Sequence, residues 1–145
     1  MPFFLLAQNT KVKVVNGLTL TNNASMDAIL VSNTSEFLNA AQSPNENNNF
    51  VWPAEKIETY ILLDEILGIT SNPITKELNF YNAQIINCIE LENTQFLMQV
   101  AYMSTNDSLP QLNAIFEIIA HKVNNSFLFS SPLKYHTSNW KTYTD

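Results

Sequence analysis

Ionisable side chains are scarce in this sequence, so few positions could support catalytic chemistry. His121 follows Glu117 by four residues in a strand-like stretch, where both side chains would point to the same face. A glutamate and a histidine so placed could form half of an acid–base or metal site. No third ligand recurs at useful spacing and HExxH is absent, so we expect an ordinary ion pair or a solvated face. His136, near Tyr135 and Trp140, is expected to pack at the domain edge.

Asp64, with Tyr60 one helical turn before it, is the strongest candidate for a working carboxylate. A carboxylate over an apolar cavity can have its pKa raised and act as a base. If helix and sheet enclose such a cavity, Phe96, Met98 and Tyr102 would line it with these two residues. The competing interpretation places Asp64 at the helix border, beside a lysine or solvent. No metal ligand set or cofactor motif is predicted, and whether the chain is an enzyme stays open.

Composition excludes some classes of partner. The chain has 145 residues, of which 46% are hydrophobic and 14% charged, with a net charge of −6. A packed core is therefore expected. Seven Lys and Arg residues without a run give no electrostatic footprint for nucleic acid or for an anionic membrane surface. Because few charges repel neighbouring molecules, homodimer formation or docking to another domain stays open.

The first residues, MPFFLLAQNT, look like the last part of an export signal, with an apolar run that ends at Ala7. The run is too short to span a bilayer and lacks a positive start, so a short buried strand is the alternative. We therefore expect residues 1–7 to be the remnant of a signal peptide and the protein to be exported, to the periplasm, the cell surface or the medium. The single Cys88 is expected to be a small core residue.

Helices are predicted in the first half of the chain. Asn23 or Ser25 can cap one, in which apolar residues recur at near-helical spacing. SPNENNN at 43–49 then indicates a loop. A second helix is predicted from VWPAEKIETYILLDEILG, with Pro53 in its first turn and Gly68 as its left-handed stop.

Strands are predicted in the second half. KVKVV at 11–15 is a short strand or an extended lead-in, and 76–104 contains two strands joined near residues 92–94. LNAIFEIIAHKV and SFLFSSPL are two more, joined by Asn124-Asn125 in a tight turn. Together these elements predict an α+β domain over 8–132, with two helices packed on a curved antiparallel sheet of about four strands. A cystatin-like or NTF2-like cone fits this order, and a plain two-layer sandwich with another strand order is the alternative.

The C-terminal tail carries a resemblance. Residues 133–145 keep the pattern Leu-x-Tyr-x-Thr-x-Asn-Trp-Lys-Thr-x-Thr, here Leu133 to Thr144. With the preceding strands, this pattern resembles the N-terminal region of exported bacterial proteins that carry a downstream gluzincin-type peptidase domain. The resemblance covers about half the chain, includes no catalytic motif, and implies that the tail is a strand-to-linker junction to a following domain. It implies no metal ligand within this chain.

These observations favour a non-catalytic accessory or interaction domain of an exported bacterial protein. Its partner would be a downstream domain or another protein, contacted by an apolar surface of one sheet face and the tail residues Leu133, Tyr135, Trp140 and Tyr143. A small-molecule-binding or isomerase-like protein with an apolar cavity is the alternative, and a self-associating structural protein is a third.

Overall fold

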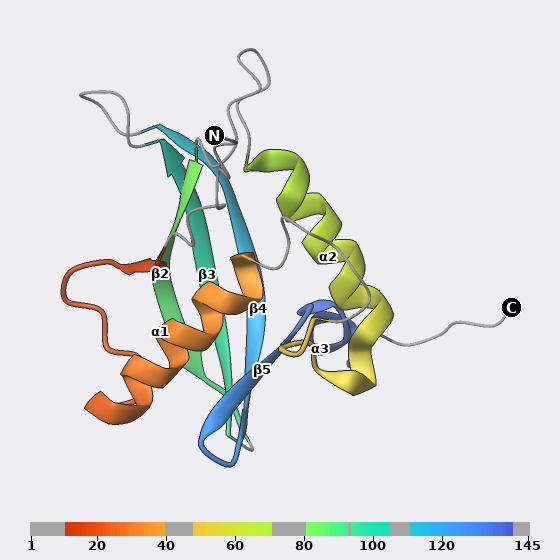
Figure 1. The fold of residues 1–145 in the computed structure, drawn as a ribbon. Coiled ribbons are helices and arrows are strands. Elements are labelled where there is room, and N and C mark those ends of the chain that lie inside the picture. Colours follow the sequence, from red (N-terminus) through yellow and green to blue (C-terminus); the bar gives the residue numbers. More distant parts are fainter. Residues whose placement is uncertain (1–10, 40–47, 71–80, 93, 105–110, 141–145) are drawn as a thin grey trace, which may run out of the picture.

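The computed structural model describes residues 11–39, 48–70, 81–92, 94–104 and 111–140. Within them, one open mixed sheet has the strand order β1-β2-β3-β4-β5, with β1 parallel to β2 and the other pairs antiparallel. The strands are β1 Lys13–Val14, β2 Tyr81–Glu90, β3 Gln95–Ser104, β4 Leu112–Val123 and β5 Ser126–Ser130. The helices of these residues are α1 Ala24–Asn39, α2 Lys56–Ile69 after a 3-10 turn at Pro53–Glu55, and α3 Leu133–Thr137. The predicted α+β class is confirmed (Figure 1).

Helix α1 begins where its cap was predicted. The side-chain oxygen Oδ1 of Asn23 accepts hydrogen bonds from the backbone N–H groups of Ser25 and Met26, at 3.1 and 3.2 Å. Two of the unpaired N–H groups at the helix start are thereby satisfied. Leu30, Phe37 and Leu38 lie on the buried side of the helix. The packing of this side against the core therefore supplies most of the stability of α1.

Helix α2 does not end at its predicted stop. Gly68 lies inside the helix, which continues to Ile69, and its φ is not positive. A glycine inside a helix costs only about 1 kcal/mol relative to alanine, so the packing of the rest of α2 can keep it helical. The buried side of α2 consists of Thr59, Leu62, Leu63 and Ile66.

The hairpin turns lie where they were predicted, whereas the segment after β5 has a different conformation from the predicted one. Asn124 adopts a φ of 55° in the β4–β5 turn, as expected of an asparagine in a tight hairpin. The predicted extended junction is instead helical over Leu133–Thr137. Pro132 precedes this helix, its carbonyl accepts a hydrogen bond from His136 N at 2.9 Å, and Ser131 Oγ accepts one from Leu133 N at 3.2 Å. These local bonds close a helical turn where an extended chain was predicted.

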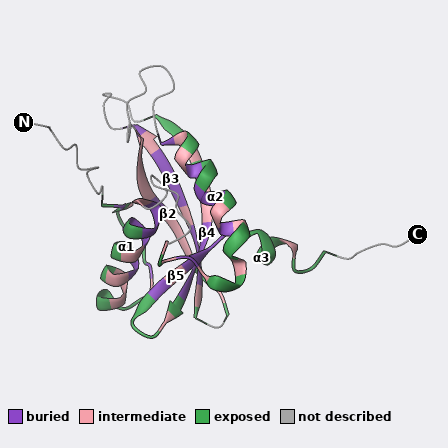
Figure 2. Cartoon of the chain, turned by 45° about the vertical axis from the view of Figure 1, so that its right-hand side comes forward, coloured by how far each residue is buried: buried purple, intermediate pink, exposed green. Residues whose placement is uncertain are grey.

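One side of the sheet meets α1 and α2, which form a layer with the core between (Figures 1 and 2). The same hydrophobic cluster contains Leu30 and Phe37 of α1, Leu63 of α2, and Met98 and Phe127 of the strands. Beside β5, the segment before α2 adds a further edge: Trp52 N donates to Phe129 O and Phe129 N donates to Phe50 O, both at 2.7 Å. No helix in the described part of the chain is long and apolar enough to cross a membrane.

Candidate functional site

His121 lies in a buried polar cluster that sequence analysis did not find. Its Nε2 is 2.7 Å from Ser130 Oγ on the neighbouring strand β5. The Trp52 ring stacks on the imidazole, with centroids 4.2 Å apart and planes 3° from parallel. Glu55 Oε2 lies 4.0 Å from the same Nε2. Burial lowers the pKa of His121 to about 4, so the imidazole is neutral near pH 7.

The cluster contains the residue types of a Ser-His-acid triad without its geometry. A nucleophilic serine must reach substrate, whereas Ser130 is fully buried. In a triad the acid holds the imidazole nitrogen opposite the serine, whereas Glu55 approaches the nitrogen that faces Ser130. The cluster therefore joins β4 and β5 to the segment before α2. Its contacts stabilise the fold and do not form a catalytic triad.

The predicted pair of His121 and Glu117 is not formed. Glu117 Oε1 instead lies 3.2 Å from Nε2 of His136, an exposed residue of α3. His136 was expected to be a packed residue and is the solvent-facing member of an ion pair. Exposed pairs of this kind contribute little to stability, so this contact is one of several weak links between α3 and the domain.

Of the residues predicted to line a ligand cavity, Phe96, Met98 and Tyr102 belong to one packed core with Tyr60 against it, whereas Asp64 does not. Asp64 is exposed on α2, and Tyr60 packs against the core with a buried hydroxyl that has no hydrogen-bond partner among the described residues. Met98 and Tyr102 are buried in the core, and burial raises the pKa of Tyr102. Strand alternation turns these two residues toward the helices, whose side chains fill the space there.

Phe96, the remaining predicted residue, lines a pocket of about 180 Å³ with Met26, Lys122 and Phe127. Typical small-molecule sites have volumes of roughly 300–1,000 Å³. This pocket is smaller and does not include Tyr60 or Asp64. It does not correspond to the predicted cavity.

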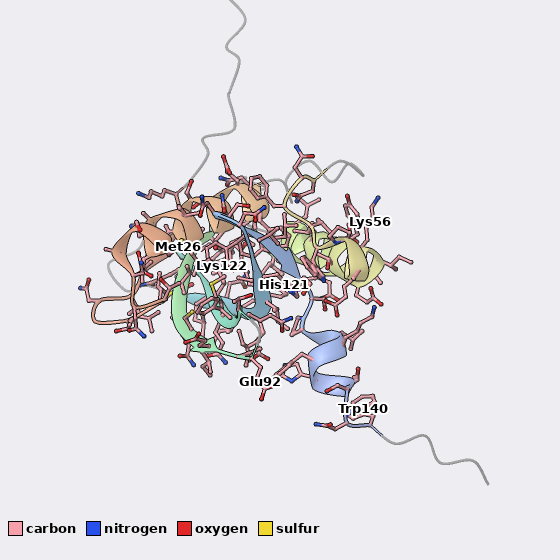
Figure 3. The ribbon with its side chains drawn as sticks, turned by 90° about the horizontal axis from the view of Figure 1, so that it is seen from below. Met26, Lys56, Glu92, His121, Lys122 and Trp140 are labelled. Atoms are coloured by element: carbon pink, nitrogen blue, oxygen red, sulfur yellow. The ribbon has the colours of Figure 1, made fainter. Side chains whose placement is uncertain are left out.

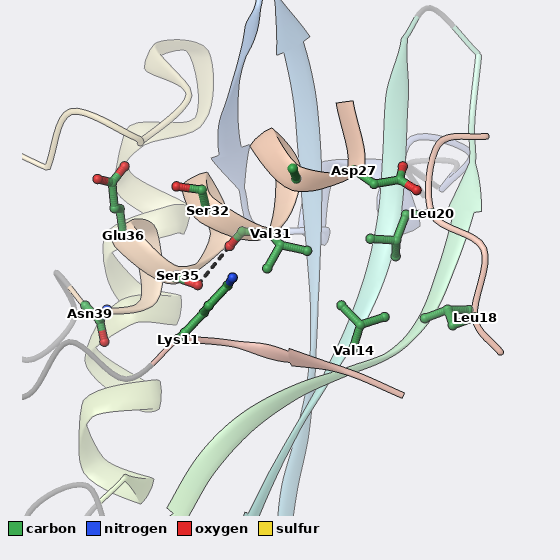
Figure 4. A pocket seen from close by; sticks show the side chains of 11 residues that line it. Lys11, Val14, Leu18, Leu20, Asp27, Val31, Ser32, Ser35, Glu36 and Asn39 are labelled. Atoms are coloured by element: carbon green, nitrogen blue, oxygen red, sulfur yellow. Dashed lines mark hydrogen bonds between the residues drawn. The ribbon is translucent and has the colours of Figure 1, made fainter. Parts of the chain in front are cut away.

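A larger groove of about 900 Å³ lies between α1 and the chain around β1 (Figure 4). Its polar lining residues include two that the fold already uses. Asp27 accepts hydrogen bonds from Thr21 N and Thr21 Oγ1, and Ser35 accepts one from Val12 N and donates one to Val31 O. Its titratable lining residues are Lys11, Asp27 and Glu36, and the Asp27 carboxylate is already held by Thr21.

Two other features bear on reactivity: the free thiol of Cys88 and the possible metal ligands. Burial, with smaller effects from Asp27 and Glu90, raises the pKa of the Cys88 thiol to about 11. The thiol is thus protonated at neutral pH and a poor nucleophile. Among the residues that the structure describes, no group of three or more His, Cys, Asp or Glu side chains is placed to hold a metal ion.

The C-terminal surface, defined as Leu133, Tyr135 and Trp140, gathers large apolar side chains at the end of the described chain. Their exposed fractions are 52%, 44% and 77%. Figure 3 shows Trp140 beyond α3, away from the sheet and the two longer helices. Tyr143, predicted to belong with them, lies outside the described residues, as do residues 1–7 of the predicted export signal.

Polar contacts on two sides hold α3 against the domain. Lys134 Nζ donates to Ala54 O at 3.1 Å and lies 4.0 Å from Glu58 Oε1, while His136 reaches Glu117 on β4. The apolar side chains of Leu133 and Tyr135 are thus presented by an anchored element.

Fold and site together define the class: an α+β domain with an open sheet, a layer of α1 and α2 on one side, and an anchored apolar C-terminal surface. No family model, curated protein or solved structure matches the chain.

Proposed function

We propose that this chain is a non-catalytic interaction domain of an exported bacterial protein, and that its C-terminal surface docks a folded protein domain. That domain is on the same polypeptide or on another. The exposure of Leu133, Tyr135 and Trp140 on an anchored element carries the proposal. Aromatic and aliphatic anchors of this kind supply most of the binding energy at protein interfaces.

The placement of polar groups supports a role without catalysis. The contact between His121 and Ser130 is buried, burial keeps the Cys88 thiol protonated, and Asp64 is exposed to solvent. A binding role needs none of these groups to react.

A crosslinking experiment tests the docking surface. A benzoylphenylalanine photo-crosslinker at Trp140 or Tyr135, in cells of the source organism, is expected to give a discrete adduct with another folded domain. The same crosslinker at Ile61, which is 58% exposed on α2, is the matched control and should give none. Adding Leu133→Asp should weaken the contact by roughly 30-fold, as expected for a hot-spot loss of about 2 kcal/mol. Adducts at positions 135 and 140 no more abundant than at 61 would refute the proposal.

We further propose that the fold belongs to the NTF2-like or cystatin-like group, as the resemblance of the sequence to accessory domains of exported gluzincin-type peptidase proteins implies. The long antiparallel strands β2 to β4 and two helices on one side support this grouping.

Export has a separate test. If residues 1–7 are the end of a signal peptide, the protein purified from its source is expected to begin at Gln8 and to be absent from the cytoplasmic fraction. Mass spectrometry of the intact protein and cell fractionation measure both. A cytoplasmic protein that retains Phe3 and Phe4 would contradict export and leave the docking proposal untouched.

A further inference from the structure

A tight turn from Val15 to Leu18 follows the edge strand β1. Leu18 N donates to Val15 O at 3.2 Å and closes the turn, in which Gly17 has a φ of 84°. Asn16 is not among the described residues with a positive φ, so the turn is of type II, which favours glycine at its third position. Asn16 and Gly17 are both exposed, and Asn16 is the one asparagine in the sequence that precedes a glycine. An Asn-Gly pair thus lies at the surface where β1 ends.

The backbone nitrogen of Gly17 is unshielded. Asparagine is a chemically labile residue, because the backbone nitrogen of the next residue can attack its side-chain amide carbon. A side chain on that next residue hinders the attack, whereas Gly17 has none and no atom lies within 4 Å of where its Cβ would be. The Gly17 N–H makes no hydrogen bond to another residue in the described part of the chain. Glycine also lets the backbone rotate toward the geometry that the attack requires.

The reaction needs only water as a co-reactant. A bond forms between Gly17 N and Asn16 Cγ while the bond from Cγ to Nδ2 breaks. The Gly17 nitrogen gives up its proton, and Nδ2 leaves as ammonia, so that a succinimide ring remains. Water then adds to one of the two ring carbonyl carbons, and the bond from that carbon to Gly17 N breaks. Opening at Cγ gives aspartate, whereas opening at the backbone carbon gives isoaspartate, in which the main chain runs through Cβ and Cγ.

Isoaspartate at this position would disturb the edge of the sheet. It adds a carbon atom to the main chain inside the turn that the bond from Leu18 N to Val15 O closes. Strand β1 consists of two residues, and the bond from Val15 N to Ile85 O at 3.0 Å extends its pairing with β2. So short a strand has few bonds with which to resist a change in the turn beside it. Val14 and Leu18, on either side of the turn, also line the groove beside α1 (Figure 4).

We propose that Asn16 is a modification site, at which spontaneous deamidation to isoaspartate lengthens the turn and releases β1 from the edge of the sheet. This proposal concerns a different part of the chain from the C-terminal surface and does not depend on the docking proposal.

Ageing of the purified full chain at mildly alkaline pH tests the site. Peptide mass spectrometry is expected to show the mass gain that replacing an amide nitrogen by oxygen produces, first at Asn16, with isoaspartate among the products. Asn125 is the internal control, because it is equally exposed in the β4–β5 turn but is followed by Ser126. Asn16 should be modified several times faster than Asn125. Asn125 reacting at least as fast, or Asn16 staying unmodified, overturns the proposed site.

Hydrogen exchange followed by NMR tests the release of β1. In the isoaspartate form, the amides of Val15 and Leu18 should exchange faster than in fresh protein, whereas Trp52 N, bonded to Phe129 O beside β5, should be unchanged. Unchanged exchange at Val15 in the isoaspartate form overturns the release of β1.

Two variants at position 16 separate the possible causes. Asn16→Gln would have to form a larger ring, so its exchange should stay constant on ageing. Asn16→Asp adds the charge without lengthening the backbone and should exchange like fresh wild type. If aged Asn16→Gln also exchanges faster at Val15, or if Asn16→Asp alone does so, lengthening of the turn is not the cause. Neither result would affect crosslinks from positions 135 and 140, so failure here and failure of the docking proposal are distinguishable.

Discussion

Replacing Phe129 by alanine is expected to lower the free energy of unfolding by about 3–5 kcal/mol. The Phe129 side chain is fully buried and stacks on Phe37 of α1, with ring centroids 4.9 Å apart. Its backbone also bonds both Phe50 and Trp52, so the residue joins β5, α1 and the segment before α2. Truncation leaves a cavity where these three elements meet. Urea denaturation followed by circular dichroism measures the loss, which is a large fraction of a typical domain stability.

Two variants make this result interpretable. Phe129→Leu keeps an apolar side chain in the same space and should cost clearly less than the alanine change. Tyr135→Ala removes an exposed aromatic ring and should change stability by no more than about 0.5 kcal/mol. A loss below about 1 kcal/mol for Phe129→Ala would show that the core does not depend on this junction.

The second large effect is a loss of stability in mild acid that depends on His121. Burial holds the pKa of this imidazole at about 4 in the folded protein, against 6.5 when it is unperturbed. Between these values the unfolded chain binds more protons than the folded one, so stability falls as pH falls from 6.5 toward 4. Allowing for partial solvent access, we expect a loss of about 2 kcal/mol over this range. Urea midpoints measured at several pH values give this slope.

Variants at the two histidines separate this effect from the titration of carboxylates. His121→Gln cannot titrate, so its stability should lack the part of the slope due to His121, although it should be lower at pH 7 because the stacking on Trp52 is lost. His136→Gln, at an exposed position, should keep the slope of the wild type. If His121→Gln shows the same slope as the wild type, His121 is not the group responsible.

Much of the fold could be predicted because its signals are local. Asn23 capped α1 as expected, and Asn124 allowed the tight β4–β5 turn. The predictions were wrong where the surrounding helix or local hydrogen bonds decide the backbone conformation. Gly68 stayed helical within α2, and the helix after Pro132 depends on hydrogen bonds from Leu133 and His136 that an apolar pattern does not reveal.

The polar cluster could not be predicted for a different reason. Trp52 and Glu55 reach His121 only because the segment before α2 runs beside β5, and nothing in their spacing along the chain announces this. The orientation of Asp64 was equally open, since it depends on α2 turning Leu63 and Ile66 toward the sheet.

The side of the sheet turned away from α1 and α2 also left a signal in the sequence. Both faces of the strand at 95–104 carry apolar residues, as Leu97, Ala101 and Met103 alternate with Met98 and Tyr102. The two predicted helices could cover only one of these faces. An apolar second face was therefore visible in the pattern, although which face would be covered was not.

The order of the core elements along the chain has a consequence during synthesis. Helices α1 and α2 leave the ribosome before β2 to β5, the strands that complete their shared core. Phe37 of α1 and Val51, in the segment before α2, meet Phe129 only after β5 has emerged, so these contacts join residues that lie far apart in the sequence. Such long-range contacts form slowly and leave apolar surface exposed in the incomplete chain. This part of the nascent chain is therefore open to chaperones and proteases until β5 has emerged.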